Sequence, residues 1–174
     1  PRLKKFANHA IRRSADLIER LSGRRIINIG SHKQGAGGIL SNFTRAPFIL
    51  DGVRWESFEG FWQAIKFPEG HEKRKKAETL FGVKAKRISS GVTTNVMYYG
   101  GREIKFGSRE LYELAKRAER ARFEQNPEQL ELLISTGKAK FLHIVGLSDS
   151  KSLPRKIFCR ILIELREEFK NNRN

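Results

Sequence analysis

The chain has 174 residues and carries 35 Lys+Arg against 19 Asp+Glu, a formal net charge of +16, while 39% of its residues are apolar. Its length suits one compact domain, so we expect a single domain over residues 1–174. The apolar content excludes a disordered polycation. No apolar run approaches the roughly 20 residues that a membrane-spanning helix needs. The positive charge predicts a polyanionic partner.

Apolar periodicity predicts helices and short strands in the following chain order. In the first half we expect a helix over 9–22, a strand over 24–29, a glycine-rich loop at 35–38, a hairpin over 47–55 that turns at Asp51-Gly52, and a helix from Phe58 to just before Pro68. Next we expect an interrupted basic helix over 71–90 and a loop or short strand over 91–107. The last expected elements are helices from Ser108 to Asn126 and from Pro127 to Gly137, a strand over 141–145 and a helix after Pro154. Strands and helices do not alternate regularly. The pattern therefore predicts a mainly helical α+β fold with a few short strands.

The positive charge is unevenly distributed along the chain. Residues 1–25 hold eight basic and two acidic residues, 66–109 hold eleven and four, and 148–174 hold seven and four. The stretches 26–65 and 110–147 are neutral. This distribution is typical of a chemical centre flanked by surfaces that hold a polyanion, and it fits a generally basic soluble surface equally well.

Cys159 is the only cysteine, and the four histidines are scattered. These facts exclude an internal disulfide and a cysteine zinc site. The N-terminal residues lack the apolar core of a signal peptide. We therefore expect a cytoplasmic protein without a metal or cofactor, in which Cys159 is a buried thiol rather than a nucleophile.

Three glycines, Gly35, Gly37 and Gly38, follow the first predicted strand. Their spacing matches neither the dinucleotide-binding fingerprint nor a phosphate loop ending in Gly-Lys-Ser/Thr. Glycines let backbone N–H groups approach a phosphate, so the cluster is a candidate phosphate-binding segment. A mobile surface loop explains it equally well.

The helix that Ser57 is expected to cap has two distinct stripes. Its apolar positions include Phe58, Phe61 and Trp62, and a second stripe is formed by Glu59, Gln63 and Lys66, spaced by four and then three. Aromatic neighbours raise the proton affinity of a carboxylate, whereas a helix N-terminus and a nearby lysine favour its charged form. The stripe is a candidate catalytic face, and a solvated face is the alternative.

The segment from Ser41 to Phe67 contains an ordered set of residues: Ser41-Asn42-Phe43, Pro47-Phe48, Leu50-Asp51-Gly52, Trp55, Ser57, Glu59, Gln63-Ala64 and Lys66-Phe67. This order resembles the hallmark of the NADAR family of YbiA-like proteins. A weaker match continues through the two helices around Pro127 and into the last helix. The resemblance covers most of the chain from about residue 26, and we expect a basic N-terminal helix (1–25) followed by a core motif segment (26–67) and a helical remainder (68–174).

The resemblance implies an N-glycosidase, an enzyme that cleaves the bond between an anomeric ribose carbon and nitrogen. Some family members act on phosphoribosyl intermediates of riboflavin synthesis; others, associated with DarT-type toxins, remove ADP-ribose from guanine bases. By the family pattern, the pocket is lined by Ser41, Asn42, Phe43, Glu59, Gln63 and Lys66. Glu59 would stabilise an oxocarbenium-like transition state, and Lys66 would pair with phosphate or attack the anomeric carbon.

The chain departs from the riboflavin-type pattern at three places. Gly60 replaces the histidine that usually follows the glutamate, Phe106 stands where a tryptophan is expected, and Asp149 and Ser150 lie where a Trp-Gly-Asp loop is missing. The missing loop argues against the small-molecule substrate. Asp149 and Ser150 are candidate ribose or phosphate ligands, and capping of the last helix explains them as well.

We therefore expect a hydrolase that removes ADP-ribose from guanine in DNA or RNA, as an antitoxin whose functional partner is a DarT-type toxin. The basic blocks would hold the backbone. Candidate aromatics for stacking on a base, each also a plausible core residue, are Phe43, Trp62, Tyr98, Tyr99 and Phe106. The alternatives are an N-glycosidase of phosphoribosyl riboflavin-pathway intermediates and a non-catalytic module that binds ADP-ribose or nucleic acid.

Overall fold

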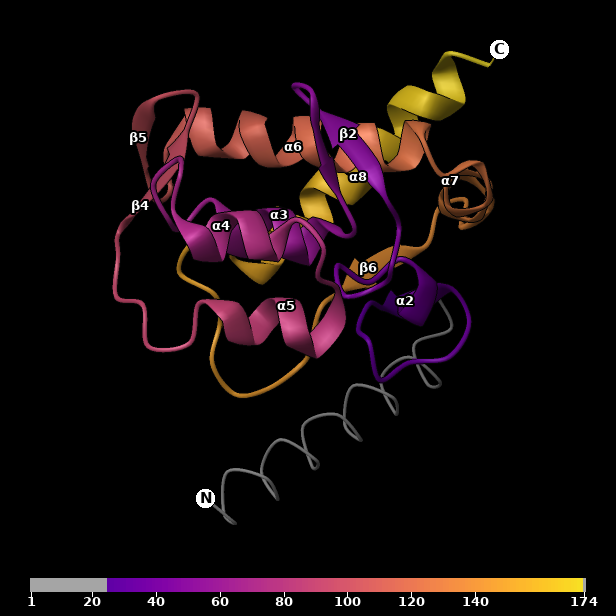
Figure 1. Cartoon of the computed structure of the whole chain (residues 1–174). Coiled ribbons are helices and arrows are strands. Elements are labelled where there is room, and N and C mark those ends of the chain that lie inside the picture. The colour runs from indigo at the N-terminus through magenta and orange to yellow at the C-terminus, as the bar shows by residue number, and fades with distance from the viewer. Residues whose placement is uncertain (1–24, 174) are drawn as a thin grey trace. The chain divides into compact units, whose positions relative to one another are not determined.

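The computed structural model describes residues 25–173 and contains seven helices and six short strands over that range (Figure 1). The predicted α+β class is confirmed. The helix expected over 9–22 lies outside the described residues. The described residues group into two compact units, a first unit of residues 25–41 and 132–173 and a second unit of Asn42–Glu131. The single-domain organisation stays a prediction.

The first unit is built on a parallel strand pair, β1 (Ile26–Asn28) with β6 (Lys140–Leu142). Helix α8 (Arg155–Asn171) packs on β6. Its Arg166 guanidinium donates to the Ala139 carbonyl at 2.9 Å and to Thr136 Oγ1 at 3.1 Å. These bonds hold α8 against the chain that leads into β6. No helix among residues 25–173 is long and apolar enough to cross a membrane.

The glycine cluster forms a short helix, α2 (Ala36–Ile39), and the expectation of a loop at 35–38 was wrong. A Cβ at Gly37 would lie 2.4 Å from the Asn28 carbonyl oxygen, and one at Gly38 would lie 2.2 Å from the Lys33 carbonyl oxygen. Since neither backbone oxygen can give way, glycine is needed at position 37 for α2 to pack on β1 and at position 38 for α2 to lie against the backbone at Lys33. The glycines here make close backbone approach possible.

The second unit contains two antiparallel hairpins. The first, β2 (Phe48–Leu50) with β3 (Val53–Trp55), turns at Asp51 and Gly52, whose φ angles of 49° and 81° are both positive. Asp-Gly is a favoured pair for such a turn, and this prediction is confirmed. The second hairpin, β4 (Val96–Tyr99) with β5 (Arg102–Lys105), forms where loop or short strand was expected.

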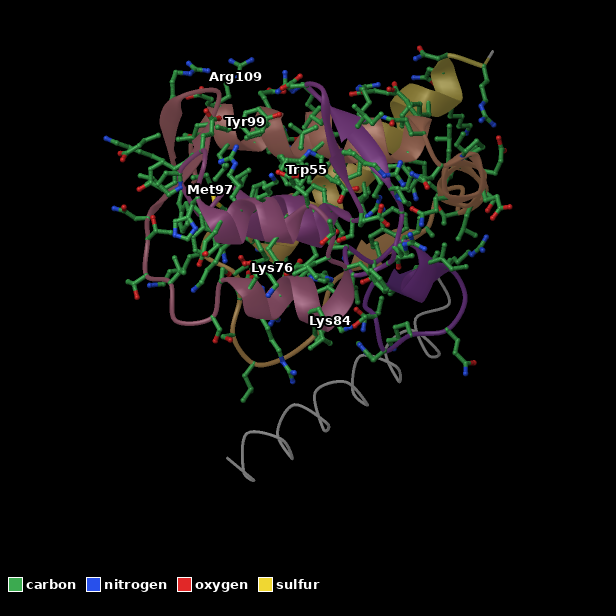
Figure 2. All side chains as sticks on the ribbon, in the orientation of Figure 1. Trp55, Lys76, Lys84, Met97, Tyr99 and Arg109 are labelled. Atoms are coloured by element: carbon green, nitrogen blue, oxygen red, sulfur yellow. The ribbon has the colours of Figure 1, made fainter. Side chains whose placement is uncertain are left out.

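Helix α3 (Phe58–Ala64) is the centre of the second unit, and all seven of its residues are buried. It contacts β3 and three helices, α4 (Glu72–Ala77), α5 (Gly82–Ile88) and α6 (Arg109–Glu124); Figure 1 shows it between α6 and α5. The Phe61 ring packs edge-on against Trp55, with centroids 5.2 Å apart, and against Tyr99 at 5.8 Å. Trp55 and Tyr99 are labelled in Figure 2.

Serine caps begin α3 and α6, as expected. Ser57 Oγ accepts from the Gly60 N–H at 2.9 Å, and Ser108 Oγ accepts from the Leu111 N–H at 3.1 Å. Ser57 Oγ also donates to the Leu80 carbonyl at 3.0 Å. The cap of α3 therefore also joins that helix to the segment between α4 and α5. Helix α7 (Pro127–Ser135) begins at the predicted proline.

Gly60 lies where the segment between α4 and α5 comes close to α3. A Cβ at Gly60 would lie 2.6 Å from the Leu80 carbonyl oxygen and 2.8 Å from that of Ala77. Both are backbone atoms. The histidine of the family hallmark would therefore require the chain at 77–80 to move away from α3.

We expect Gly60→Ala to destabilise the protein by about 1–3 kcal/mol, because the added methyl forces backbone to shift in a packed interior. Urea denaturation followed by circular dichroism measures the change in unfolding free energy. Lys75→Ala on the exposed side of α4 is the control and should change stability by less than about 0.5 kcal/mol. Equal stability of Gly60→Ala and wild type would show that the close approach carries no constraint.

Candidate active site

Helix α3 places Glu59 and Gln63 one turn apart on the same side. Gln63 Nε2 donates to Glu59 Oε1 at 2.8 Å, and the Glu59 N–H donates to the Asn42 carbonyl at 3.1 Å. Glu59 is 4% exposed and Gln63 is 1% exposed. The polar stripe predicted on this helix therefore faces the interior, and the solvated-face alternative is wrong.

Two further side chains extend the Glu59–Gln63 pair into a polar chain of four residues. Ser89 Oγ donates to Gln63 Oε1, and Lys66 Nζ donates to Ser89 Oγ at 3.4 Å. We call Lys66, Ser89, Gln63 and Glu59 the polar chain. Every donor in it points toward Glu59, the arrangement that suits an ammonium at one end and a carboxylate acceptor at the other.

Helix α5 brings a second lysine to the carboxylate. Lys86 Nζ lies 3.5 Å from Glu59 Oε1, and the Lys86 side chain is 55% exposed while that of Glu59 is 6% exposed. Lys86 and Ser89 are three residues apart and so lie on one side of the helical turn. The site is therefore built from α3, the residues just after it, and one side of α5.

The surroundings of Lys66 shift its pKa. Burial lowers the pKa of the Lys66 ammonium, the positive charge of Lys86 lowers it further, and Glu59 acts in the opposite direction. A lysine with a lowered pKa holds a larger fraction of neutral, nucleophilic amine at neutral pH. Lys66 is thus chemically suited to either of its predicted roles.

Other predicted site residues also belong to the second unit. Asn42 is 8% exposed, and its Oδ1 accepts no hydrogen bond within the described chain. Trp62 is 3% exposed and stacks on Phe58 at 5.6 Å, so it contributes to the core. Phe43 is partly exposed. Phe106 is also partly exposed and closes the second hairpin through its N–H to the Asn95 carbonyl. Their roles in binding stay predictions.

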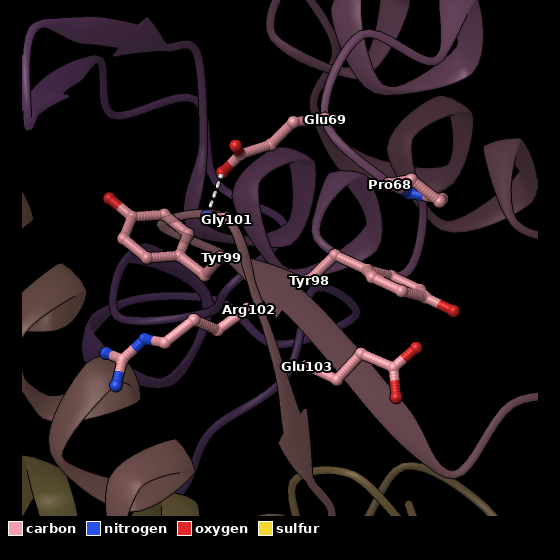
Figure 3. Close-up of a pocket in the computed structure, with 7 residues that line it drawn as sticks. All are labelled: Pro68, Glu69, Tyr98, Tyr99, Gly101, Arg102 and Glu103. Atoms are coloured by element: carbon pink, nitrogen blue, oxygen red, sulfur yellow. Dashed lines mark hydrogen bonds between the residues drawn. The ribbon is translucent and has the colours of Figure 1, made fainter.

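A hollow of about 170 Å³ lies on the β4–β5 hairpin, apart from the polar chain. Its lining residues, drawn in Figure 3, are Pro68, Glu69, Tyr98, Tyr99, Gly101, Arg102 and Glu103. Tyr98 and Tyr99 point to opposite sides of β4 in that view. The Tyr99 hydroxyl donates to Asp51 Oδ2 at 2.7 Å, and burial raises the pKa of Tyr99. Tyr99 therefore links the two hairpins.

The remaining predicted site residues belong to the first unit. Asp149 Oδ1 accepts from the Arg155 N–H at 3.0 Å, and Ser150 Oγ accepts from the Leu153 N–H at 3.1 Å. The Asp149 bond reaches the first residue of α8, as the capping alternative expects, whereas the Ser150 bond goes to a residue that precedes the helix. Ser41, 2% exposed, donates its N–H to the Gly38 carbonyl. Ribose or phosphate binding by these residues, and by the three glycines, stays a prediction.

The described residues hold no group of three or more His, Cys, Asp or Glu side chains arranged to bind a metal ion. Cys159 is buried, and burial together with Asp149 raises the pKa of its thiol to about 12. A thiol with so high a pKa is a poor nucleophile at neutral pH. The expectation that Cys159 is buried is confirmed.

Sequence reasoning missed Ser89 and Lys86. Ser89 ends α5 in a Ser-Ser-Gly stretch typical of a turn, and Lys86 is one of several lysines in a basic segment. Neither carries a local signal of function. Only the packing of α5 on α3, across 26 residues of sequence for the Ser89–Gln63 bond, brings them to the site.

The chain is similar in sequence to one family model and to several known proteins. A family model described as "Bacteriophage protein GP30.3" matches residues 34–167. The N-glycosidase YbiA of Escherichia coli (strain K12) is 32% identical over 133 residues, covering 74% of this chain and 75% of that protein. This chain belongs to the YbiA-like (NADAR) family. The YbiA of Shigella flexneri serotype 5b (strain 8401) shows the same identity and coverage.

A solved structure agrees with the fold. The NMR structure of E. coli YbiA matches with a TM-score of 0.60 and 24% identity, covering 85% of this chain and 86% of that chain. The family expected from the motif between Ser41 and Phe67 is confirmed by the 32% identity to YbiA over 133 residues. Membership of its DarT-associated branch stays a prediction.

Lys66 provides a test of the site's electrostatics. Lys86→Ala should raise the Lys66 pKa, because it removes a neighbouring positive charge, and Glu59→Gln should lower it, because it removes a negative one. NMR titration of the lysine side-chain ε-carbons measures both shifts. Lys84→Ala, on the same helix but outside the polar chain, is the control and should leave the Lys66 pKa unchanged. Shifts of the same sign in the first two variants would contradict this arrangement.

The same pKa shift predicts a pH dependence of stability. The folded-state pKa of Lys66 lies below its unfolded value, so the unfolded chain binds more protons between the two pKa values. The unfolding free energy should therefore rise with pH through that window. Lys66→Met should reduce this rise, measured as the difference from wild type in urea denaturation at successive pH values.

Proposed function

We propose that this protein is an N-glycosidase that removes ADP-ribose from guanine bases of nucleic acid. The observation that carries the proposal is the buried Glu59 carboxylate at the end of a polar chain that begins at Lys66. Relatives named as N-glycosidases, 32% identical to this chain, support the general reaction. The guanine and ADP-ribose specificity is supported by the absence of the Trp-Gly-Asp loop and by the basic charge.

Glu59 suits the chemistry of glycosidic cleavage. When the bond between the anomeric carbon and the base nitrogen breaks, its electron pair leaves with the base, which takes up a proton, and positive charge develops at the anomeric carbon. A fixed carboxylate stabilises that charge. Water then adds to the anomeric carbon and loses a proton, for which Glu59 is a suitable acceptor. The Asn42 and Gln63 amides supply hydrogen-bonding groups for ribose hydroxyls.

Lys66 has two candidate roles. As an ammonium it would pair with a substrate phosphate. As a neutral amine it would attack the anomeric carbon, forming a carbon–nitrogen bond as the base leaves, and water would later release the sugar. The lowered pKa favours the second role, and the hydrogen bond to Ser89 holds the group in place for either.

The charge distribution supports a nucleic-acid substrate. Between residues 71 and 90 the exposed charged side chains are Lys73, Lys75, Lys76, Lys84, Lys86 and Arg87, against Glu72 alone among acidic ones. Basic surfaces of this kind bind phosphate backbones without reading sequence. An antitoxin function toward a DarT-type ADP-ribosyltransferase follows from the same proposal.

We expect the protein to release ADP-ribose from a guanine-ADP-ribosylated oligonucleotide, and Glu59→Gln to lower the rate by about 10²–10⁴-fold while leaving binding within a few-fold. Chromatography of the products measures the release. Glu72→Gln on the exposed side of α4 is the matched control and should keep wild-type activity. Turnover of phosphoribosyl riboflavin-pathway intermediates alone would support the other N-glycosidase function, and binding without any turnover would support a non-catalytic module.

Lys66→Arg separates the two roles of the lysine. The arginine keeps the positive charge but is not a nucleophile, so activity survives in part if Lys66 only pairs with phosphate. Complete loss, together with a borohydride-trapped adduct formed by wild type and not by the variant, would establish the covalent route. Full activity of Lys66→Arg without any trapped adduct in wild type would exclude it.

A further inference from the structure

The turn before α5 and the exposed side of that helix combine apolar and basic side chains. Phe81 is 47% exposed and Val83 is 53% exposed, although both are large apolar residues. Lys84 and Arg87, three residues apart, are exposed beside them. We call Phe81, Val83, Lys84 and Arg87 the α5 surface.

Arg45 adds a fixed cation next to Phe81. Its guanidinium carbon lies 6.0 Å from the centre of the Phe81 ring, and its Nε donates to Glu56 Oε2 at 2.7 Å. The Arg45 side chain is 61% exposed. An exposed aromatic ring beside a positioned guanidinium is a combination that stacks on nucleobases in proteins that bind single strands.

Helix α4 extends the positive charge. Lys73, Lys75 and Lys76 are exposed along it; Lys76, on α4, and Lys84, on α5, are labelled in Figure 2. The α5 surface thus adjoins a basic helix, and the two together are complementary to a chain of phosphates.

The α5 surface is directly connected to the polar chain. Lys86 and Ser89 of the same helix contact Glu59 and Gln63, and the Leu80 carbonyl just before Phe81 accepts from Ser57 Oγ at the start of α3. Phe81 and Lys86 are five residues apart, about 7.5 Å along the helix axis. That is about two nucleotide steps at roughly 3.4 Å each.

We propose that the α5 surface binds single-stranded nucleic acid next to the modified base, with an unpaired base stacked on Phe81 and backbone phosphates on Lys84 and Arg87. The proposal deepens the proposed function and rests on it for the identity of the base that is cleaved. A single strand suits the surface better than a duplex because a base stacks on Phe81 only when it is unpaired. A lipid surface suits it less well, since α5 has seven residues and lacks the broad apolar face of an interfacial helix.

The test measures binding of a fluorescein-labelled, unmodified single-stranded oligonucleotide by fluorescence anisotropy at several salt concentrations. Phe81→Leu should weaken binding by about fivefold or more, because it keeps an apolar side chain but removes the stacking face. Lys84→Ala/Arg87→Ala should lower the magnitude of the salt slope by about 0.7 for each phosphate that the variant no longer binds. Ile49→Ala, at a residue that is 52% exposed on β2, and Lys138→Ala/Lys140→Ala, which removes two exposed charges from the first unit outside the three basic stretches, are the controls and should match wild type.

Thermal unfolding of each variant checks that the substitutions, all at exposed positions, leave the fold intact. Wild-type affinity and salt slope in the α5 variants would overturn the proposal. So would tighter binding of the matching duplex than of the single strand, or a loss of binding to phosphatidylserine vesicles without a loss of oligonucleotide binding. Because the oligonucleotide is unmodified, these results do not depend on glycosidase activity. Failure to release ADP-ribose would therefore contradict the proposed function while leaving a binding result on the α5 surface standing.

Discussion

Helix α3 has no exposed residue, so its polar side chains Glu59 and Gln63 must find hydrogen-bond partners inside the protein. A buried carboxylate is costly unless it is paired and hydrogen-bonded. Gln63, one turn on in the same helix, donates to Glu59, and α5 supplies Lys86 to Glu59 and Ser89 to Gln63. The position of α5 against α3 is therefore the constraint on which the site depends, and Gly60 makes the close approach of the preceding segment possible.

The contacts that satisfy α3 also assemble the chemistry. Ser57 Oγ accepts from the Gly60 N–H and donates to the Leu80 carbonyl, so one hydroxyl both caps the helix that carries Glu59 and binds the segment that leads into α5. Ser89 at the end of α5 then joins Lys66 to Gln63. Because one side of α5 serves the carboxylate and the other carries exposed cations, cleavage and strand binding would share a single element. Such sharing would let the neutral segment that carries Glu59 act beside strongly basic segments.

Prediction from the sequence succeeded where the signal was local. Asp51-Gly52 specifies a turn through its own backbone angles, and Ser57 and Ser108 cap helices through bonds to residues three positions away. It failed at Gly37 and Gly38, because their role is to admit the carbonyls of Asn28 and Lys33, which sequence composition does not reveal. The second hairpin carries little hydrophobic alternation, so its sequence does not distinguish a strand from a loop.

The sequence by itself determined the family, the distribution of charge and the spacing of Glu59, Gln63 and Lys66. Helical periodicity alone places Glu59 and Gln63 on one side of a helix. Only the tertiary structure decided that this side faces inward, that Ser89 and Lys86 complete it, and that Phe81 stays exposed. The physical reason is distance along the chain. The bonds from Ser89 span 23 residues to Lys66 and 26 to Gln63, so they depend on how α5 packs, and no local pattern encodes that packing.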